Sequence, residues 1–299
     1  MNKQSIIKNS VDIPNVKFKR DQTLGFELIP LKNLVNILKP YKDHHPYKPH
    51  RLKFYAIIFI TGGKGKHFID FQSYDYYRGT VFFISKDQIH AFDPPKKVEG
   101  ELILFTETFF TKHLSDTERF TFNSLFNYHI YSPVNYLSSE QFTIFERILV
   151  SMREEFSQQS DLFKPHILRN LLKQFLLQFE RLRSGHEGRM DARCYNEFIA
   201  FQELLDKHIH EERSVKFYAQ QLGISTKKMN LMTQRIANVN SKNYISSRFI
   251  LEVKRLLISS YASINEIAYK MGFEDPTNFV KFFKKYSGET PAAFRKSRI

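Results

Sequence analysis

Two segments of this chain, SVKFYAQQLGIS and SINEIAYKMGFE, are copies of one pattern, and the repeat restricts the C-terminal third to paired helices. Aligned 49 residues apart, both begin with serine, a preferred helix N-cap, and both carry an alanine (Ala219, Ala268) and a glycine (Gly223, Gly272) at matching positions. The alanine lets a second helix cross closely. The glycine supplies the left-handed backbone that ends a helix. Each copy therefore predicts a helix followed by a tight turn.

A second helix is predicted after each turn, now at a separation of 50 residues. Ser225 is the expected N-cap of the first such helix, and Asp275, followed by Pro276 at the first helical position, caps the other. The expected outward stripes are polar and basic: Thr226, Lys227, Asn230, Leu231 and Gln234 on the first, Thr277, Asn278, Lys281 and Lys284 on the second. A helix, a tight turn and a basic second helix are what reading a major groove requires.

The segment between the copies predicts a stiff connecting helix, because Ile245, Phe249, Val253 and Leu256 form one apolar face. About 18 residues of helix span ~27 Å, so two recognition helices can lie roughly one turn of DNA apart. Residues 207–299 hold 17 lysines and arginines against seven acidic residues, most of the net charge of +14. Such a basic module favours phosphate binding. The alternatives are a helical interaction domain with solvated lysines and a nucleoid-type binder without sequence preference.

The N-terminal half predicts β structure followed by helices. Short apolar runs such as RLKFYAIIFI and YYRGTVFFIS, separated by glycines, indicate antiparallel strands of a sandwich or small barrel. From Ser139 the period changes to that of two amphipathic helices, with Pro165 near the start of the second. The predicted fold class is thus α+β multidomain. The expected parts are a solvated arm (1–20), a β-barrel (21–135), a helical segment (136–183), a linker (184–194) and a helix-turn-helix domain (195–299).

Other features exclude several classes of protein. The single cysteine, Cys194, leaves no internal disulfide and favours a reducing compartment. The sequence has no run of about 18 apolar residues and no N-terminal signal stretch, so a cytoplasmic protein without membrane contact is expected. No P-loop, G-x-S-x-G, C-x-x-C or H-E-x-x-H motif is present. We therefore expect neither an enzyme nor a bound cofactor.

The C-terminal segment GFEDPTNFVKFFKKYSGETPAAFR, with its Gly-Phe turn, its aromatic pair and its closing Thr-Pro, resembles the AraC/XylS family of bacterial transcription regulators. The resemblance covers both repeats and the connecting helix. It implies base contacts from Lys227, Asn230, Leu231, Thr277, Asn278 and Lys281. It implies contacts to the DNA backbone from Thr226, Gln234, Arg248, Lys284 and Lys285.

The first repeat departs from the family pattern at three positions. Thr233 stands where an aromatic residue usually fills the core, Asn238 where glycine is common, and Leu231 where a polar or basic residue often reads bases. Asparagine tolerates a left-handed backbone, so Asn238 is compatible with the turn. Thr233 and Leu231 weaken the expectation of base contacts in the first unit, which favours the second as the main reader.

The N-terminal half resembles the cupin-like barrel that many members of this family carry. The segments HRLKFYAIIFITGGKGKHFIDF and YYRGTVFFISKDQIHAF carry this likeness. It implies a barrel of ~8 strands and dimerisation through residues 139–183. In that family the barrel holds a small effector or none detectable, so a small-molecule effector stays an open alternative here, and RNA polymerase is a candidate partner. The expected effector pocket is lined by Tyr55, Phe59, His67, Phe82 and His90. The duller interpretation is that these side chains only fill the barrel interior.

Histidines in this half raise the rival hypothesis of a metal-dependent cupin enzyme with a helical appendage. Metal cupins use a His-x-His pair with a downstream glutamate, whereas Phe68 and Ile69 follow His67 here. His67, Asp70 and His90 could still converge on a metal. No metal is expected, and the favoured hypothesis is a dimeric, sequence-specific regulator of transcription, with activation favoured over repression.

Overall fold

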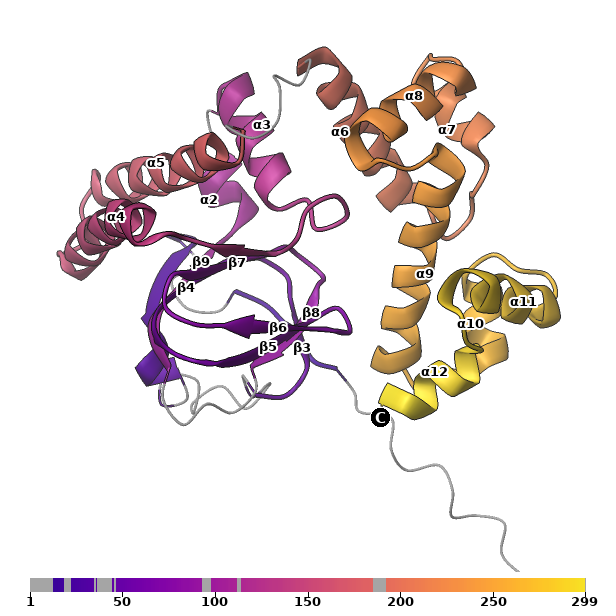
Figure 1. Ribbon diagram of the computed structural model, residues 1–299, viewed down its shortest axis with the longest axis horizontal. Helices are drawn as coiled ribbons and strands as arrows, with labels where there is room; N and C mark the ends of the chain where they lie inside the picture. Colours follow the sequence, from indigo (N-terminus) through magenta and orange to yellow (C-terminus); the bar gives the residue numbers. More distant parts are fainter. Residues whose placement is uncertain are drawn as a thin grey trace, which may run out of the picture. The chain divides into compact units, whose positions relative to one another are not determined.

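The computed structural model describes residues 13–18, 23–34, 36, 45, 47–92, 98–111, 114–184 and 192–298 (Figure 1). Residues 14–190 and 191–299 form two compact units, called here the β unit and the helical unit. Within the described ranges, no helix combines the length and the apolar character needed to cross a bilayer.

Two five-stranded sheets make up the framework of the β unit. One has the order β1-β3-β8-β5-β6 and the other β10-β7-β4-β9-β2. All pairs are antiparallel except β1 with β3. The cupin-like prediction is confirmed, but the described strands pair as two sheets and do not close into one barrel. The strands are β1 (Asn15–Val16), β2 (Phe26–Pro30), β3 (His50–Leu52), β4 (Tyr55–Gly63), β5 (Gly65–Ile69), β6 (Gln72–Tyr76), β7 (Thr80–Ile84), β8 (Ile89–Phe92), β9 (Val98–Phe105) and β10 (Val134–Tyr136).

Strand β4 contributes side chains to two separate apolar cores. Ala56, Ile58 and Ile60 belong to a core shared by both sheets. Ile57 and Phe59 belong to a second core, formed with the helices that follow the strands. Because successive side chains of a strand point to opposite faces, a strand buried on both sides becomes a continuous apolar run.

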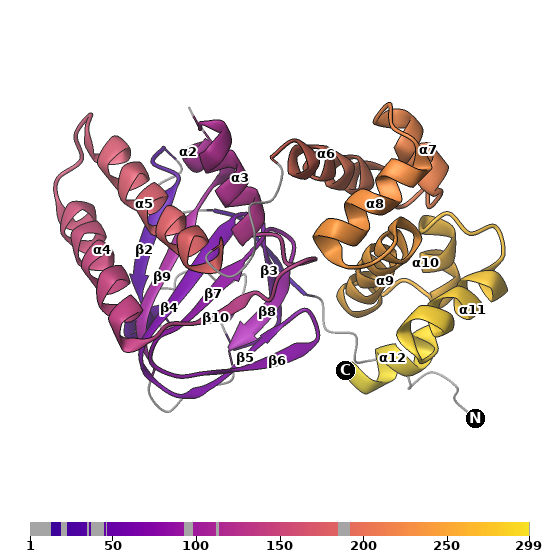
Figure 2. The same cartoon turned by 45° about the horizontal axis from the view of Figure 1, so that its top comes forward.

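Helices cover the outer face of the β10-β7-β4-β9-β2 sheet (Figure 2). The two predicted amphipathic helices are confirmed as α4 (Ser139–Ser157) and α5 (Lys164–Ser184), with Pro165 as the second residue of α5. Two shorter helices, α2 (Glu107–Thr111) and α3 (Asp116–Leu125), lie outside the prediction. A capping box of Ser115 and Glu118 starts α3, a sequence signal that could have revealed it.

The solvated arm predicted for residues 1–20 is wrong for its described part. Val16 on β1 is buried in the core between the sheets, and β1 pairs with β3. Burial of an apolar side chain and the ladder hydrogen bonds hold this segment on the sheet. The other residues of the predicted arm, 1–12 and 19–20, lie outside the described residues, as do 185–191 of the predicted linker. Helix α6 begins at Ala192, inside the predicted linker.

Seven helices of the described chain form the helical unit: α6 (Ala192–His208), α7 (Val215–Gln221), α8 (Thr226–Ala237), α9 (Ser241–Ser259), α10 (Ile264–Lys270), α11 (Pro276–Ser287) and α12 (Pro291–Arg298). The pairs α7–α8 and α10–α11 are the two helix-turn-helix units, and α9 connects them as predicted (Figure 1). Ile245, Phe249 and Val253 of α9 are buried, with Leu257 in place of the predicted Leu256.

Candidate DNA-binding surface and effector site

The second helix-turn-helix unit is held by local hydrogen bonds that its sequence specifies. At the start of α10, Ser263 Oγ accepts from the Glu266 amide at 3.1 Å, and the Ser263 amide donates to Glu266 Oε2 at 2.6 Å. Gly272 adopts a left-handed φ of 72° in the turn. The Asp275 carboxylate then accepts from the Thr277 amide at 2.8 Å, which fixes the start of α11.

The first unit closes in a similar way with fewer caps. Gly223 has a left-handed φ of 63°, and Ser225 Oγ accepts from the Lys228 amide at 3.1 Å to start α8. Asn238 ends α8 with a left-handed φ of 56°, as its side chain permits. Ser214 precedes α7 without a side-chain capping hydrogen bond, so the predicted cap is absent there.

Thr233 fills its core position through hydrogen bonds instead of an aromatic ring. Its hydroxyl is paired with Ser241 Oγ at 3.0 Å and bonds to the Met229 carbonyl oxygen at 3.2 Å. Both hydroxyl side chains are fully buried. Since buried polar groups must be hydrogen-bonded, this pair replaces apolar packing at the joint between α8 and α9.

All the residues predicted on the two outer stripes are exposed. On α8 these are Thr226, Lys227, Asn230, Leu231 and Gln234, and on α11 they are Thr277, Asn278, Lys281 and Lys284. Lys285, predicted to contact the DNA backbone, is exposed too. Met229, Met232, Phe279 and Phe283 are buried on the opposite faces. Each helix therefore presents an exposed and largely polar and basic face opposite its buried one.

Two details modify the predicted surface of α8. Asn230 Oδ1 accepts from the Ser241 amide at 3.0 Å, so only the amide NH₂ of this side chain remains to donate to a base. Arg235, absent from the prediction, is exposed one turn after Leu231 on the same stripe. Its spacing of four residues from Leu231 is a sequence signal that could have revealed it.

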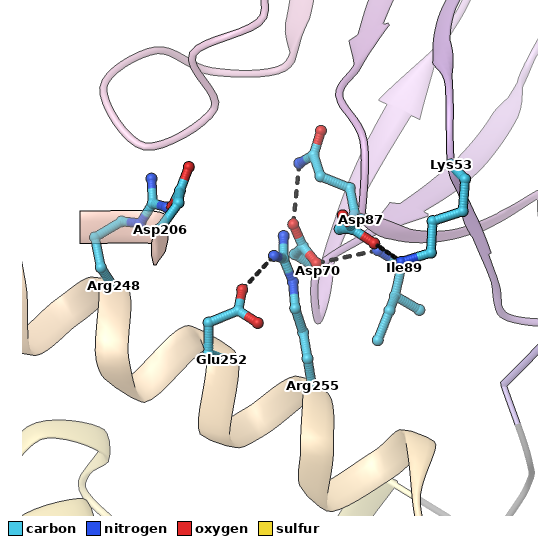
Figure 3. A network of polar contacts seen from close by, with 9 residues as sticks. Lys53, Asp70, Asp87, Ile89, Asp206, Arg248, Glu252 and Arg255 are labelled. Carbon is cyan, nitrogen blue, oxygen red and sulfur yellow. Dashed lines mark hydrogen bonds and ion pairs between the residues drawn. The ribbon is translucent and has the colours of Figure 1, made fainter. Parts of the chain in front are cut away.

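The predicted phosphate contact of Arg248 is wrong. Its guanidinium forms an ion pair with Asp206 of α6, and its side chain is 6% exposed. Figure 3 shows Arg248 directed at Asp206 and, further along α9, Arg255 directed at Glu252. A buried guanidinium that is paired with a carboxylate of its own chain is not available to DNA, so Arg248 joins α6 to α9 instead.

The five residues of the predicted effector pocket do not share one face: Tyr55, Phe59 and Phe82 lie on β4 and β7 of one sheet, and His67 and His90 lie on β5 and β8 of the other. Phe59 and Tyr55 pack in the core beneath the helices, so their assignment to a pocket between the sheets is wrong. Phe82 lies in the core between the sheets, and the rings of His67 and Phe82 have centroids 5.0 Å apart. The His67 and His90 rings are 5.4 Å apart. Three of the five predicted residues are therefore together.

His67 is the most unusual polar group of the β unit. It is fully buried, and neither ring nitrogen has a hydrogen-bond partner among the described residues. Burial, reinforced by the nearby His50, lowers the pKa of His67 to about 3, so the ring is neutral near pH 7. A neutral imidazole offers one donor and one acceptor. The ring can thus pair with a polar group that enters between the sheets.

Asp70 does not join these histidines in a metal site. Its carboxylate accepts from Gln88 Nε2 at 3.0 Å and from the Ile89 amide at 3.2 Å, and so fastens the turn after β5 to β8 (Figure 3). In the part of the chain that the structure describes, no group of three or more histidine, cysteine or acidic side chains is placed to hold a metal ion.

Comparison with known proteins matches both halves of this architecture. A family model described as AraC-like ligand binding domain matches residues 37–195, and one described as helix-turn-helix domain matches residues 218–297. The HTH-type transcriptional activator RhaS of Escherichia coli O139:H28 is 22% identical over 273 residues, covering 91% of this chain and 96% of RhaS.

Solved structures with likeness to the chain include one full-length protein and one isolated domain. ToxT of Vibrio cholerae O395 is 13% identical, with a TM-score of 0.40, over 91% of this chain and 97% of ToxT. The C-terminal domain of the response regulator yesN of Fusobacterium nucleatum is 24% identical, with a TM-score of 0.32, over 33% of this chain and 98% of that domain. Since the ligand-binding family model alone spans more than half of the sequence, the chain belongs to the AraC family of DNA-binding transcription regulators.

Proposed function

We propose that this regulator binds its operator as a homodimer in the cytoplasm. Each chain inserts α8 and α11 into successive major-groove segments, and a small effector bound between the two sheets controls the regulator. Activation of transcription, through contact with RNA polymerase, is the favoured outcome, since RhaS is named a transcriptional activator. The observation that carries the proposal is the pair of exposed polar and basic faces on α8 and α11, two helices joined through the single connecting helix α9.

The length of α9 supports simultaneous reading by both units. Its 19 residues correspond to about 28 Å of helix, close to the ~34 Å of one turn of duplex. The outer face of α11 carries three exposed lysines, Lys281, Lys284 and Lys285. In this proposal Lys281 reads a base edge, while Lys284 and Lys285 neutralise phosphates.

Lys281→Ala is expected to lower affinity for the natural operator roughly ten- to hundred-fold and to relax base preference at one position. Selection of genomic fragments from the host with the purified full chain supplies the operator, and binding titrations on all single-base variants measure the preference. Unchanged affinity and unchanged preference would show that Lys281 is not a base reader.

Lys285→Ala is the matched control, because it removes the same charge from the same helix. It is expected to weaken all duplexes alike and to reduce the slope of log affinity against log salt by about one unit. Equal affinity of the wild type for operator and random duplexes at ~150 mM salt would instead identify a binder without sequence preference and overturn the proposed function.

The proposed dimer surface is the outer side of α5 with the loop before it. Leu162 and Phe163 in the loop are 85% and 68% exposed, and Ile167 and Leu177 of α5 are exposed too. Leu162, Phe163 and Ile167 are close neighbours in the chain, and exposed side chains of this size form an apolar patch that a second copy would cover. These residues fall within the segment that the family resemblance assigns to dimerisation.

Acid is expected to destabilise the β unit through His67. Since its pKa is lowered in the folded state, folding holds this ring neutral, and stability is lost as pH falls from about 6.5 towards about 3. Between pH 6.5 and pH 5 this loss is about 2 kcal/mol. Urea unfolding followed by circular dichroism measures the free energy of unfolding at each pH. His67→Leu should not show this decrease of stability between pH 6.5 and pH 5, whereas His166→Leu, at an exposed position on α5, should show it as the wild type does. Identical acid sensitivity in wild type and His67→Leu would contradict the assignment.

A further inference from the structure

The loop between α6 and α7, which leads directly into the first helix-turn-helix unit, contacts the turn of the second. Arg213 in this loop donates from Nη1 to the Met271 carbonyl oxygen at 2.8 Å and from Nη2 to the Gly272 carbonyl oxygen at 3.4 Å. Met271 is the C-cap of α10, and Gly272 begins the turn towards α11. One side chain of the first unit is therefore bonded to the segment that orients the second recognition helix.

The same guanidinium is enclosed by two aromatic rings. It lies 4.1 Å from the centroid of the Phe273 ring and 5.0 Å from that of Phe249 on α9. The Phe249 and Phe273 rings also contact each other, with centroids 5.9 Å apart. Arg213 thus joins three elements, namely its own loop, the connecting helix and the second turn.

Neighbouring contacts make this joint tight. His210 Nδ1 lies 3.1 Å from Met271 Sδ, and a Cβ atom added to Gly272 would lie only 2.7 Å from the His210 carbonyl oxygen. The two backbones therefore touch where the guanidinium binds. A cation at the C-terminal carbonyls of a helix is stabilised by the helix dipole, and cation–π contacts with both rings add to this.

We propose that Arg213 is a positioning residue that fixes the distance and orientation between α8 and α11. It thereby determines which spacing the protein accepts between two half-operators, which are here the DNA segments read by α8 and by α11 of one chain. The effect on DNA rests on the proposed function, in which both helices enter the groove. The contacts of Arg213 with Met271, Gly272, Phe249 and Phe273, called here the clamp, lie within the protein. The geometric part of the proposal therefore does not depend on the proposed function. Arg213 needs no contact with DNA for this role.

The first test measures the protein without DNA. Spin labels at Arg235→Cys on α8 and Lys284→Cys on α11, in a Cys194→Ser background, report the distance between the recognition helices by pulsed electron resonance. We expect one narrow distribution in the otherwise wild-type chain and a broad one after Arg213→Ala. Arg213→Lys should also give a broad distribution, because an ammonium lacks the planar fork that lets a guanidinium stack on the Phe273 ring while it bonds to the two carbonyl oxygens. A narrow distribution in Arg213→Ala would overturn the clamp.

The second test varies the selected operator by inserting or deleting one base pair between its two half-operators. Wild type should bind one spacing best. Arg213→Ala should lose about ten-fold on that spacing, become nearly indifferent to the others, and bind an isolated half-operator as wild type does. Lys216→Ala, which removes an exposed charge from α7, is the control and should retain the spacing preference.

The outcomes of the two tests are separable. Equal loss on half and full operators with the spacing preference intact would make Arg213 an ordinary phosphate contact and overturn the proposal. A broadened distance distribution in a protein whose wild type ignores spacing would retain the clamp and refute simultaneous reading by both helices, which is the proposed function. Loss of spacing preference together with broadened distances supports the proposal in full.

Discussion

Gly272→Ala is expected to disrupt the second helix-turn-helix unit far more than Gly223→Ala disrupts the first. Both glycines have a left-handed φ, 72° and 63°, which costs a residue with a Cβ atom about 1–2 kcal/mol. At Gly272 the added Cβ would also lie 2.7 Å from the backbone oxygen of His210, whereas nothing lies within 4 Å of it at Gly223. We therefore expect a total cost of about 3 kcal/mol or more at Gly272, since a backbone must move.

Hydrogen exchange on the full chain measures the difference unit by unit. In Gly272→Ala, amides of α10 and α11 should exchange roughly a hundred-fold faster, and operator affinity should fall with them, because α11 loses its orientation. Gly223→Ala is the matched control, with the same change of residue and nearly the same φ but open space around it. Equal effects of the two substitutions would show that the contact between Gly272 and His210 does not constrain the turn.

The features predicted from sequence are those that local chemistry determines. The N-cap Ser263, the cap at Asp275 and the left-handed Asn238 depend on neighbours within a few residues, so the sequence displays them directly. The exposed stripes of α8 and α11 follow from helical periodicity in the same way. The repeat then placed these local features in one architecture.

The incorrect or missing predictions concern residues whose role depends on a partner that is distant in the sequence. Arg248 carries the charge and position of a phosphate contact, but its partner Asp206 lies 42 residues earlier in the chain. No local pattern reports such a pair. Arg213 was missed for the same reason, because its acceptors at Met271 and Gly272 belong to the other unit. Polar residues in loops acquire a role only when the fold brings a partner to them.

Two of the five residues predicted for the effector pocket were misplaced because the strands are buried on both faces. Alternation separates Phe59 from Ile58, but in a run that is apolar throughout it does not show which set faces the other sheet. The helices that cover Phe59 decide the question, and they come later in the chain. His67 and His90 were predictable because polar side chains within an apolar strand indicate a special environment.

The double variant Leu162→Asp with Phe163→Asp is expected to convert the proposed dimer into a monomer that still folds. Both side chains are mostly exposed, so carboxylates there cost the β unit little, but burial of two charges in an apolar interface without partners is prohibitive. On DNA carrying two copies of the site that one chain reads, as the operator of the proposed dimer does, affinity should fall ~10²–10⁴-fold, because the second binding event ceases to be intramolecular. On DNA with one copy it should be unchanged.

Light scattering gives the oligomeric state of the double variant. Phe68→Asp on β5, at a side chain that is 42% exposed, controls for an acidic residue elsewhere on the β unit. A double variant that remained dimeric would place the interface on another face, whereas a monomer with full affinity for two copies would show that each chain binds DNA independently.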